Sequence, residues 1–143
     1  MSVNPQSTLD YLQHLAQAYA IHRIRRAEIG GLQTFEIGEK CYFEDWGLRN
    51  ATFGYQARRD AGALMENIVC RHLLQCGYRV YVGVSGKREI DFLAMRQDEK
   101  LYVQVALSVA DEGTYAREFG NLQDIGDNYP KYVVTLNDTL AGG

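Results

Sequence analysis

Three oxygen-bearing side chains, Glu66, Asp91 and Gln104, stand in segments whose residue patterns place them close to an apolar core. Glu66 lies beside the apolar stripe of a predicted helix, where a carboxylate is desolvated unless a cation or a hydrogen-bond donor meets it. Asp91 and Gln104 belong to two predicted strands joined by a tight turn over residues 97–99. Side chains alternate faces along a strand, so Asp91 and Gln104 are expected to share one face of the sheet. The sequence therefore predicts a polar group near the core that an ionic or hydrogen-bonding partner must meet.

This arrangement resembles the restriction-endonuclease-like nuclease superfamily, PD-(D/E)xK. Its sites have an acid on a first helix, Asp on one strand and Glu-x-Lys on the next, where the acids hold Mg²⁺ and the lysine stabilises charge at the phosphate. Glu66 and Asp91 match the two acids, whereas Gln104 stands at the second strand acid and Ala106 at the lysine. Loss of one preorganised charge-stabilising group costs ~10²–10³ in rate. The resemblance therefore implies a remnant site of Glu66, Asp91 and Gln104 in a non-catalytic protein.

A second interpretation is that the site still cleaves DNA. Glu66 and Asp91 would suffice for a Mg²⁺-dependent DNA endonuclease if a lysine from elsewhere, Lys87 or Lys100, replaced the missing cation. Under the first interpretation no metal and no cofactor is expected.

The elements that must position these residues follow from hydrophobic periodicity and turn signals. A helix is expected from Ser7, with Asp10 completing a capping box, and a second helix from Asp60 to Cys76. On the strand that carries Asp91, the alternation predicts Ile90, Phe92 and Ala94 together on the opposite face. The expected extended segments are residues 21–29, 32–37, 40–44, 79–83, 89–95, 101–108 and 131–136, with a further helix from Asp111 to Leu122. This order predicts an α/β fold, a mixed sheet flanked by helices.

Longer stretches of the chain resemble one known domain. It is the domain of unknown function that ends a family of prokaryotic AAA-type P-loop ATPases, in which the glutamine-bearing strand is common. The stretches that carry the resemblance are Tyr42–Asn50, Glu66–Val69, Gly77–Gly83, Glu89–Phe92, Val103–Ala106 and Asp127–Leu136.

The resemblance implies a division of the chain. Residues 1–45 correspond to a partial winged-helix-like unit, a helix and a β-wing, and residues 46–143 to a restriction-endonuclease-like core, apparently truncated. It also implies a partner, a P-loop ATPase module or its subunits, and an accessory role. Apolar core left exposed by missing segments makes a homodimer a further expectation.

The wing carries three arginines that favour a different function. Arg23, Arg25 and Arg26 follow the first helix, and such side chains contact phosphates. They predict a DNA-binding module as a further alternative, although charged residues also keep a strand edge soluble. The formal net charge of -3 does not favour a nucleic-acid binder, but residues 51–100 hold eight Lys/Arg against six Asp/Glu. Any polyanion is therefore expected to meet the middle of the chain.

Composition limits the remaining classes. The hydrophobic fraction is 46% and the charged fraction 23%, typical of a globular protein. No apolar run approaches the roughly 20 residues of a membrane span, so a cytoplasmic protein without membrane contact is expected. Three cysteines without a C-x-x-C pair and three scattered histidines predict no metal site. The segment from Gly83 to Arg88 lacks the spacing of a phosphate-binding loop and is predicted to be a turn.

Overall fold

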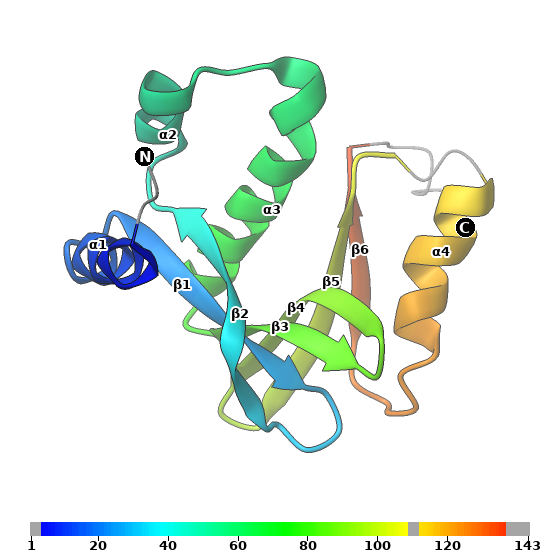
Figure 1. Cartoon of the computed structure of the whole chain (residues 1–143). Coiled ribbons are helices and arrows are strands. Elements are labelled where there is room, and N and C mark those ends of the chain that lie inside the picture. The colour runs from blue at the N-terminus through cyan, green and yellow to red at the C-terminus, as the bar shows by residue number, and fades with distance from the viewer. Residues whose placement is uncertain (1–3, 109–111, 137–143) are drawn as a thin grey trace.

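A six-stranded mixed sheet forms the framework of the computed structural model, which describes residues 4–108 and 112–136 (Figure 1). The strand order is β2-β1-β3-β4-β5-β6, in which β1–β3 and β5–β6 are parallel pairs and the other pairs are antiparallel. The strands are β1 (Ile21–Glu28), β2 (Thr34–Phe43), β3 (Arg79–Ser85), β4 (Arg88–Arg96), β5 (Glu99–Ala106) and β6 (Lys131–Thr135). The helices are α1 (Pro5–Gln17), α2 (Trp46–Phe53), α3 (Ala57–Gln75) and α4 (Glu112–Gln123). The predicted mixed sheet with flanking helices is confirmed.

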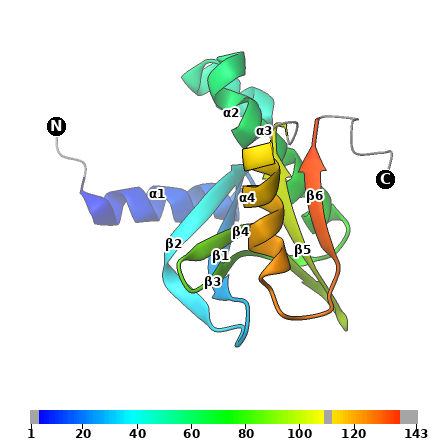
Figure 2. The same ribbon diagram turned by 90° about the vertical axis from the view of Figure 1, so that its right-hand side faces the viewer.

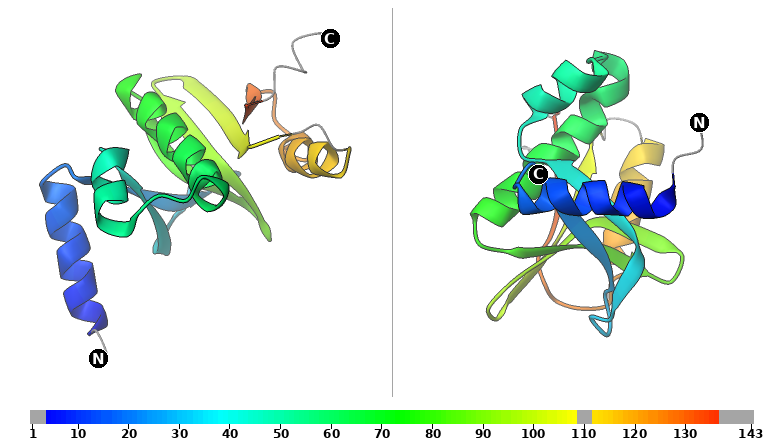
Figure 3. Two further views of the ribbon diagram at one scale, coloured as in Figure 1. Left: turned by 90° about the horizontal axis from the view of Figure 1, so that it is seen from above. Right: turned by 60° about the vertical axis from the view of Figure 1, so that its left-hand side comes forward.

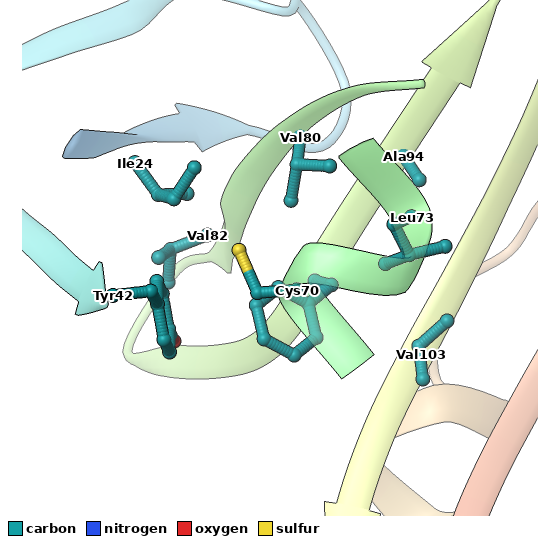
Figure 4. Packing of buried hydrophobic residues seen from close by; sticks show 9 residues of the cluster. Ile24, Tyr42, Cys70, Leu73, Val80, Val82, Ala94 and Val103 are labelled. Atoms are coloured by element: carbon teal, nitrogen blue, oxygen red, sulfur yellow. The ribbon is translucent and has the colours of Figure 1, made fainter. Parts of the chain in front are cut away.

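Two apolar clusters lie on opposite faces of the sheet, one under α3 and one under α4. The first joins Cys70 and Leu73 of α3 to Val80, Val82 and Val103 of the sheet, as Figure 4 shows. The second joins residues around the end of α4 to the other face, and its buried members are Ala27, Ile29, Ile90, Leu93, Tyr102, Leu122 and Ile125. The turned view of Figure 2 shows α3 and α4 on either side of the strands. Each helix therefore covers its own face, as expected for an α/β domain.

The first helix starts earlier than the pattern predicted, and the predicted capping box is wrong. Asn4 is the N-cap and accepts a hydrogen bond from the Gln6 backbone N–H, with Pro5 in the first turn. Asp10 instead accepts from the Gln6 side-chain amide. Proline in the first turn loses no helical hydrogen bond, which favours this earlier start. The helix buries none of its residues and stands away from the sheet (Figure 3).

The hairpin predicted as a separate wing is part of the main sheet. β1 pairs with β2 and, in parallel, with β3 through Arg26–Val82 to Glu28–Val84. The two runs predicted as separate strands, residues 32–37 and 40–44, form the single strand β2. Gly38, at φ +84°, lets β2 continue through an irregularity in its pairing with β1. The division of the chain at residue 45 stays a prediction.

The predicted connection between β2 and α3 contains a short helix, α2. Asp45 is its N-cap and accepts hydrogen bonds from the Gly47 and Leu48 backbone N–H groups. The helix ends at Gly54, at φ +71°. Asp60, predicted as the N-cap of the next helix, lies in the first turn of α3 and accepts from the backbone N–H of the true N-cap, Gln56.

Asn67 fastens α3 to the last residue of β2. Its side-chain oxygen accepts from the Phe43 backbone N–H at 2.7 Å, and its side-chain nitrogen donates to the Phe43 carbonyl at 2.8 Å. Asn67 is only 2% exposed, so water cannot replace these bonds. The Asn67 amide therefore fixes the position of α3 along its axis relative to the end of β2.

We expect Asn67→Ala to lower the free energy of unfolding by about 2–3 kcal/mol, because it leaves two backbone groups of Phe43 without partners. Urea unfolding followed by circular dichroism measures this change. The neighbouring variant Ile68→Ala, at a side chain that is mostly exposed, is the matched control and is expected to stay within about 0.5 kcal/mol. Equal stabilities of the two variants would contradict the fastening role of the amide.

Candidate functional site

Two of the predicted site residues, Asp91 and Gln104, meet where β4 and β5 separate. The ladder between these strands ends at the pair Phe92–Val103. Beyond it, the Asp91 backbone N–H donates to Gln104 Oε1 at 3.2 Å, and Asp91 Oδ2 accepts from the Val105 backbone N–H at 2.8 Å. Both residues are buried, at 8% exposure each. Asp91 and Gln104 are therefore neighbours, but the contact is made by the Asp91 backbone, whereas the Asp91 carboxylate bonds to Val105 and takes the place of the next rung of the ladder.

The predicted faces of β4 are wrong at one position. Tyr81 pairs with Leu93 and Gly83 pairs with Ile90, so two β4 residues, Asp91 and Phe92, stand opposite one residue of β3. This bulge breaks the alternation. Ile90 joins Leu93 in the cluster under α4, whereas Phe92 and Ala94 remain under α3. A bulge redirects the side chains beside it, and here it accompanies the contacts that Asp91 makes with β5 and β2.

Lys40 of β2 lies among three carboxylates, and the sequence analysis missed it. Its Nζ is 2.8 Å from Glu89 Oε1 and 3.9 Å from both Glu66 Oε2 and Asp91 Oδ1. These contacts bring Glu66 and Asp91 to one ammonium group from two different elements. We name Lys40, Glu66, Glu89 and Asp91 the acid cluster.

Tyr42 supplies a neutral donor to the acid cluster. Its hydroxyl donates to Glu66 Oε2 at 3.2 Å, and its ring packs against Phe92 with centroids 5.5 Å apart. Burial raises the pKa of the Tyr42 hydroxyl well above its usual range, and the nearby Glu66 carboxylate adds to the effect. Burial, with Glu66, also raises the pKa of the Cys70 thiol to about 12. Both groups therefore stay protonated at neutral pH, and the charge balance rests on lysine, arginine and the carboxylates.

Arg26 supplies a second cation to the acid cluster, from β1. Its Nη1 pairs with Glu89 Oε2, and its Nε donates to the Gly38 carbonyl at 2.6 Å. Burial opposes ionisation of Glu89, but the hydrogen bonds from Lys40 and Arg26 outweigh it and hold the Glu89 pKa below its usual range. Glu89 is therefore ionised and has a cation on each oxygen.

The other two arginines of the predicted DNA-binding set share one acid. Arg23 pairs with Glu39 at 2.6 Å and Arg25 with the same carboxylate at 3.4 Å. Of the three, Arg25 keeps the most exposed side chain, at 63%. The set lies on β1 with acidic partners, which reduces the charge it offers to a phosphate backbone.

The lysines predicted as replacements lie elsewhere. Lys100 Nζ approaches the Ile29 carbonyl and Asp127 at 3.4 and 3.5 Å. Lys87 is exposed at the turn between β3 and β4, and among the described residues no contact joins it to Glu66 or Asp91. Lys40, and not Lys100, is the lysine that lies beside Glu66 and Asp91.

The acid cluster opens into a cavity of about 320 Å³ between β2, α2 and α3. Lys40, Tyr42 and Glu66 line one part of it, and Trp46 and Arg49 of α2 line another. Within residues 4–108 and 112–136, no group of three or more histidine, cysteine, aspartate or glutamate side chains is arranged to hold a metal ion. The site therefore combines a network of ion pairs centred on Lys40 with an open cavity beside it.

Comparison with known proteins identifies a relative of this chain. A Haemophilus influenzae protein, described as an uncharacterized protein, is 38% identical over 125 residues, which cover 87% of this chain and 30% of the relative. The chain thus spans about a third of the relative's length. No family model matches the chain, and no solved structure matches it. None of the helices in the described ranges is long and apolar enough to cross a membrane.

We expect Lys40→Met to lower the free energy of unfolding at neutral pH by about 1–2 kcal/mol, because three carboxylates then keep only one cation. Lys40 and Glu89 retain 28% and 35% of their side-chain exposure, so the loss is smaller than the ~3–5 kcal/mol of a fully buried pair. The exposed Lys87→Met is the matched control and is expected to leave stability unchanged.

The same variants carry a pH signature. Because the folded-state pKa of Glu89 lies below its ordinary 4.5, its contribution to stability is present above that pH and is lost as the pH falls through the folded pKa. Urea unfolding from pH 6 down to about 3 is therefore expected to show a shallower loss of stability in Lys40→Met than in the wild type. Parallel profiles would mean that Lys40 does not balance these carboxylates.

Proposed function

We propose that this chain is a non-catalytic accessory domain of a prokaryotic AAA-type P-loop ATPase, with a restriction-endonuclease-like core and a remnant nuclease site. The observation that carries the proposal is the Lys40 ammonium among the carboxylates of Glu66, Glu89 and Asp91. In this proposal, a protein cation takes the position at which the superfamily holds a metal ion.

Charge and ligand supply both support this conclusion. Mg²⁺ requires oxygen ligands in near-octahedral geometry and resists dehydration. Here Asp91 Oδ2 accepts from Val105, Glu66 Oε2 accepts from Tyr42, and both Glu89 oxygens have cations. A metal ion would have to displace Lys40 and compete with these bonds. The positions of Gln104 and Ala106 add neither a charge nor a proton donor to a phosphate reaction.

The accessory role also has support outside the site. About two thirds of the Haemophilus influenzae relative lies beyond the matched part, which leaves room for a further module such as a P-loop ATPase. The Asp45–Asn50 stretch that carries the resemblance forms the start of α2, where Arg49 pairs with Asp60 of α3 at 3.1 Å. We place the protein in the cytoplasm, with an ATPase module or its subunits as the partner and a second copy of the chain as a further one.

One observation favours a second candidate function, a Mg²⁺-dependent DNA endonuclease. Lys40 Nζ is equally distant, at 3.9 Å, from Glu66 and Asp91. A lysine beside two convergent acids is the arrangement that the superfamily uses, and Lys40 would then supply the missing cation from β2. In this candidate Lys40 must move aside when a metal ion binds.

The two candidates are separated by Mn²⁺ and Mg²⁺ titration with calorimetry, together with cleavage assays on supercoiled and branched DNA. For an accessory domain we expect no saturable ion binding by the wild type, no cleavage, and an unfolding temperature that millimolar Mn²⁺ leaves unchanged. Lys40→Met is also expected to show no saturable Mn²⁺ binding, because the acids in the described ranges are not arranged as a metal-ligand set.

Cleavage by the wild type that is lost in both Glu66→Gln and Lys40→Met would replace the accessory domain by the nuclease. Lys87→Met serves as the control for the general effect of one removed positive charge. For the ATPase partnership, the measurement is the rate of ATP hydrolysis by a P-loop ATPase encoded beside this chain, with and without the chain added. An unchanged rate and no complex in size-exclusion chromatography would remove that partner.

A further inference from the structure

The segment from α2 to the start of α3 exposes aromatic side chains that the acid cluster does not use. Phe53, at the end of α2, is 66% exposed and Tyr55, two residues on, is 49% exposed. Figure 1 shows this segment above the sheet, where α2 leads by a short connection into α3. Each of these rings can bury a large apolar face against a flat partner.

Positive charge accompanies these rings. The stretch from Trp46 to Arg59 contains three arginines and no acidic residue. Arg49 and Arg59 share Asp60, whereas Arg58 is exposed and has no acidic partner among the residues that the structure describes. With Asp45 and Asp60 at its two ends counted, the segment still carries one net positive charge, in a chain whose formal net charge is -3. An acidic ligand is the chemical class that this charge selects.

Arg49 connects the exposed rings to the cavity. Its guanidinium lies 5.0 Å from the centroid of the Trp46 ring and 6.0 Å from that of Phe53. Trp46 and Arg49 line the cavity of about 320 Å³, which falls at the small end of ligand clefts, about 300–1,000 Å³. Arg49 thus joins the cavity to the Phe53 ring and, through Asp60, to Arg59, while Tyr55 and Arg58 lie between Phe53 and Arg59 along the chain. We name these residues the α2 platform: Trp46, Arg49, Phe53, Tyr55, Arg58 and Arg59.

We propose that the α2 platform binds single-stranded nucleic acid. Unpaired bases offer flat faces that stack on exposed aromatic rings, and the phosphates between them meet exposed arginines. A duplex hides its base faces, so it can use the arginines but not Phe53 and Tyr55. A protein partner would also cover aromatic rings, but an acid-free stretch with three arginines matches a polyanion better. The proposal does not depend on the state of the acid cluster, and it places nucleic acid on a different surface from Arg23, Arg25 and Arg26.

The test is fluorescence anisotropy of a labelled oligothymidylate of about 20 nucleotides with the full chain, over a range of salt concentrations. We expect salt-dependent binding that is stronger than for a duplex of the same length. Phe53→Ala and Tyr55→Ala are each expected to weaken binding by about tenfold, the effect of losing one stacked base. Arg58→Ala is expected to reduce the slope of log affinity against log salt by about 0.7, one phosphate contact to a single strand.

Two matched controls lie on other surfaces. Tyr11→Ala removes an exposed ring of α1, and Arg25→Ala removes the exposed arginine of β1; both are expected to bind like the wild type. Trp46 is the single tryptophan of the sequence, so a change in its fluorescence on titration locates the ligand at the platform. All of the substituted side chains are exposed, and circular dichroism verifies that the variants stay folded.

Several outcomes would overturn the inference. Binding that is weakened by Arg25→Ala but not by Arg58→Ala would place nucleic acid on β1. Equal affinity for duplex and single strand, without any effect of Phe53→Ala, would mean that no base stacks on the platform. No binding at low salt, together with self-association that Phe53→Ala abolishes, would make the platform a protein interface.

Discussion

The ion-pair contacts of Lys40 hold together elements that the chain brings from distant positions. Its ammonium lies against carboxylates of α3 and β4, although it belongs to β2, at the far edge of the sheet. An isolated carboxylate at low exposure is costly, and three of them repel one another. One ammonium and the Arg26 guanidinium convert that repulsion into attraction. The approach of β2, α3 and β4 on this face of the sheet therefore depends on where the lysine lies.

Two local features fix the positions of β2, α3 and β4 relative to one another. Asn67 bonds both backbone groups of Phe43 and so fixes α3 against β2, one residue along the helix from Glu66. The β4 bulge places two residues, Asp91 and Phe92, opposite one residue of β3. Neither the Asn67 hydrogen bonds nor the β4 bulge takes part in a reaction. Together they bring the cluster's carboxylates within reach of Lys40, and the same geometry would serve an inert domain or a metal-assisted enzyme. What separates the two is whether the ammonium stays or leaves.

The α2 platform, beside the acid cluster, differs from the cluster in its charge pairing and exposure. In the cluster, Lys40 and the neighbouring Arg26 supply two positive charges to three carboxylates, so most of the charge is paired. On the α2 platform, aromatic rings and an arginine without an acidic partner among the described residues face solvent. A fold can retain a polar network after its chemistry is lost, because the network still stabilises packing, whereas exposed rings contribute little to packing. We therefore expect this protein's binding role to lie on the platform rather than in the cluster.

Local pattern was enough for the parts of the molecule that are close in sequence. The apolar period of α3, with Gly77 after it, and the three strands that follow were predicted with small errors at their ends, because each depends on neighbours along the chain. The contact between Asp91 and Gln104 was predicted for the same reason, since a tight turn joins their strands.

Tertiary structure decided the rest. Lys40 and Glu89 are far apart in the sequence and on strands that are not neighbours in the sheet, so no periodicity could pair them. The bulge at Asp91 depends on Ile90 packing under α4, and α2 rests on its Asp45 cap and on the Arg49–Asp60 pair, which offset weak helix formers such as Gly47 and Thr52. The sequence alone determined which groups could do chemistry, and the folded chain determined which cation they meet, because ion pairing across a sheet is set by topology and not by spacing.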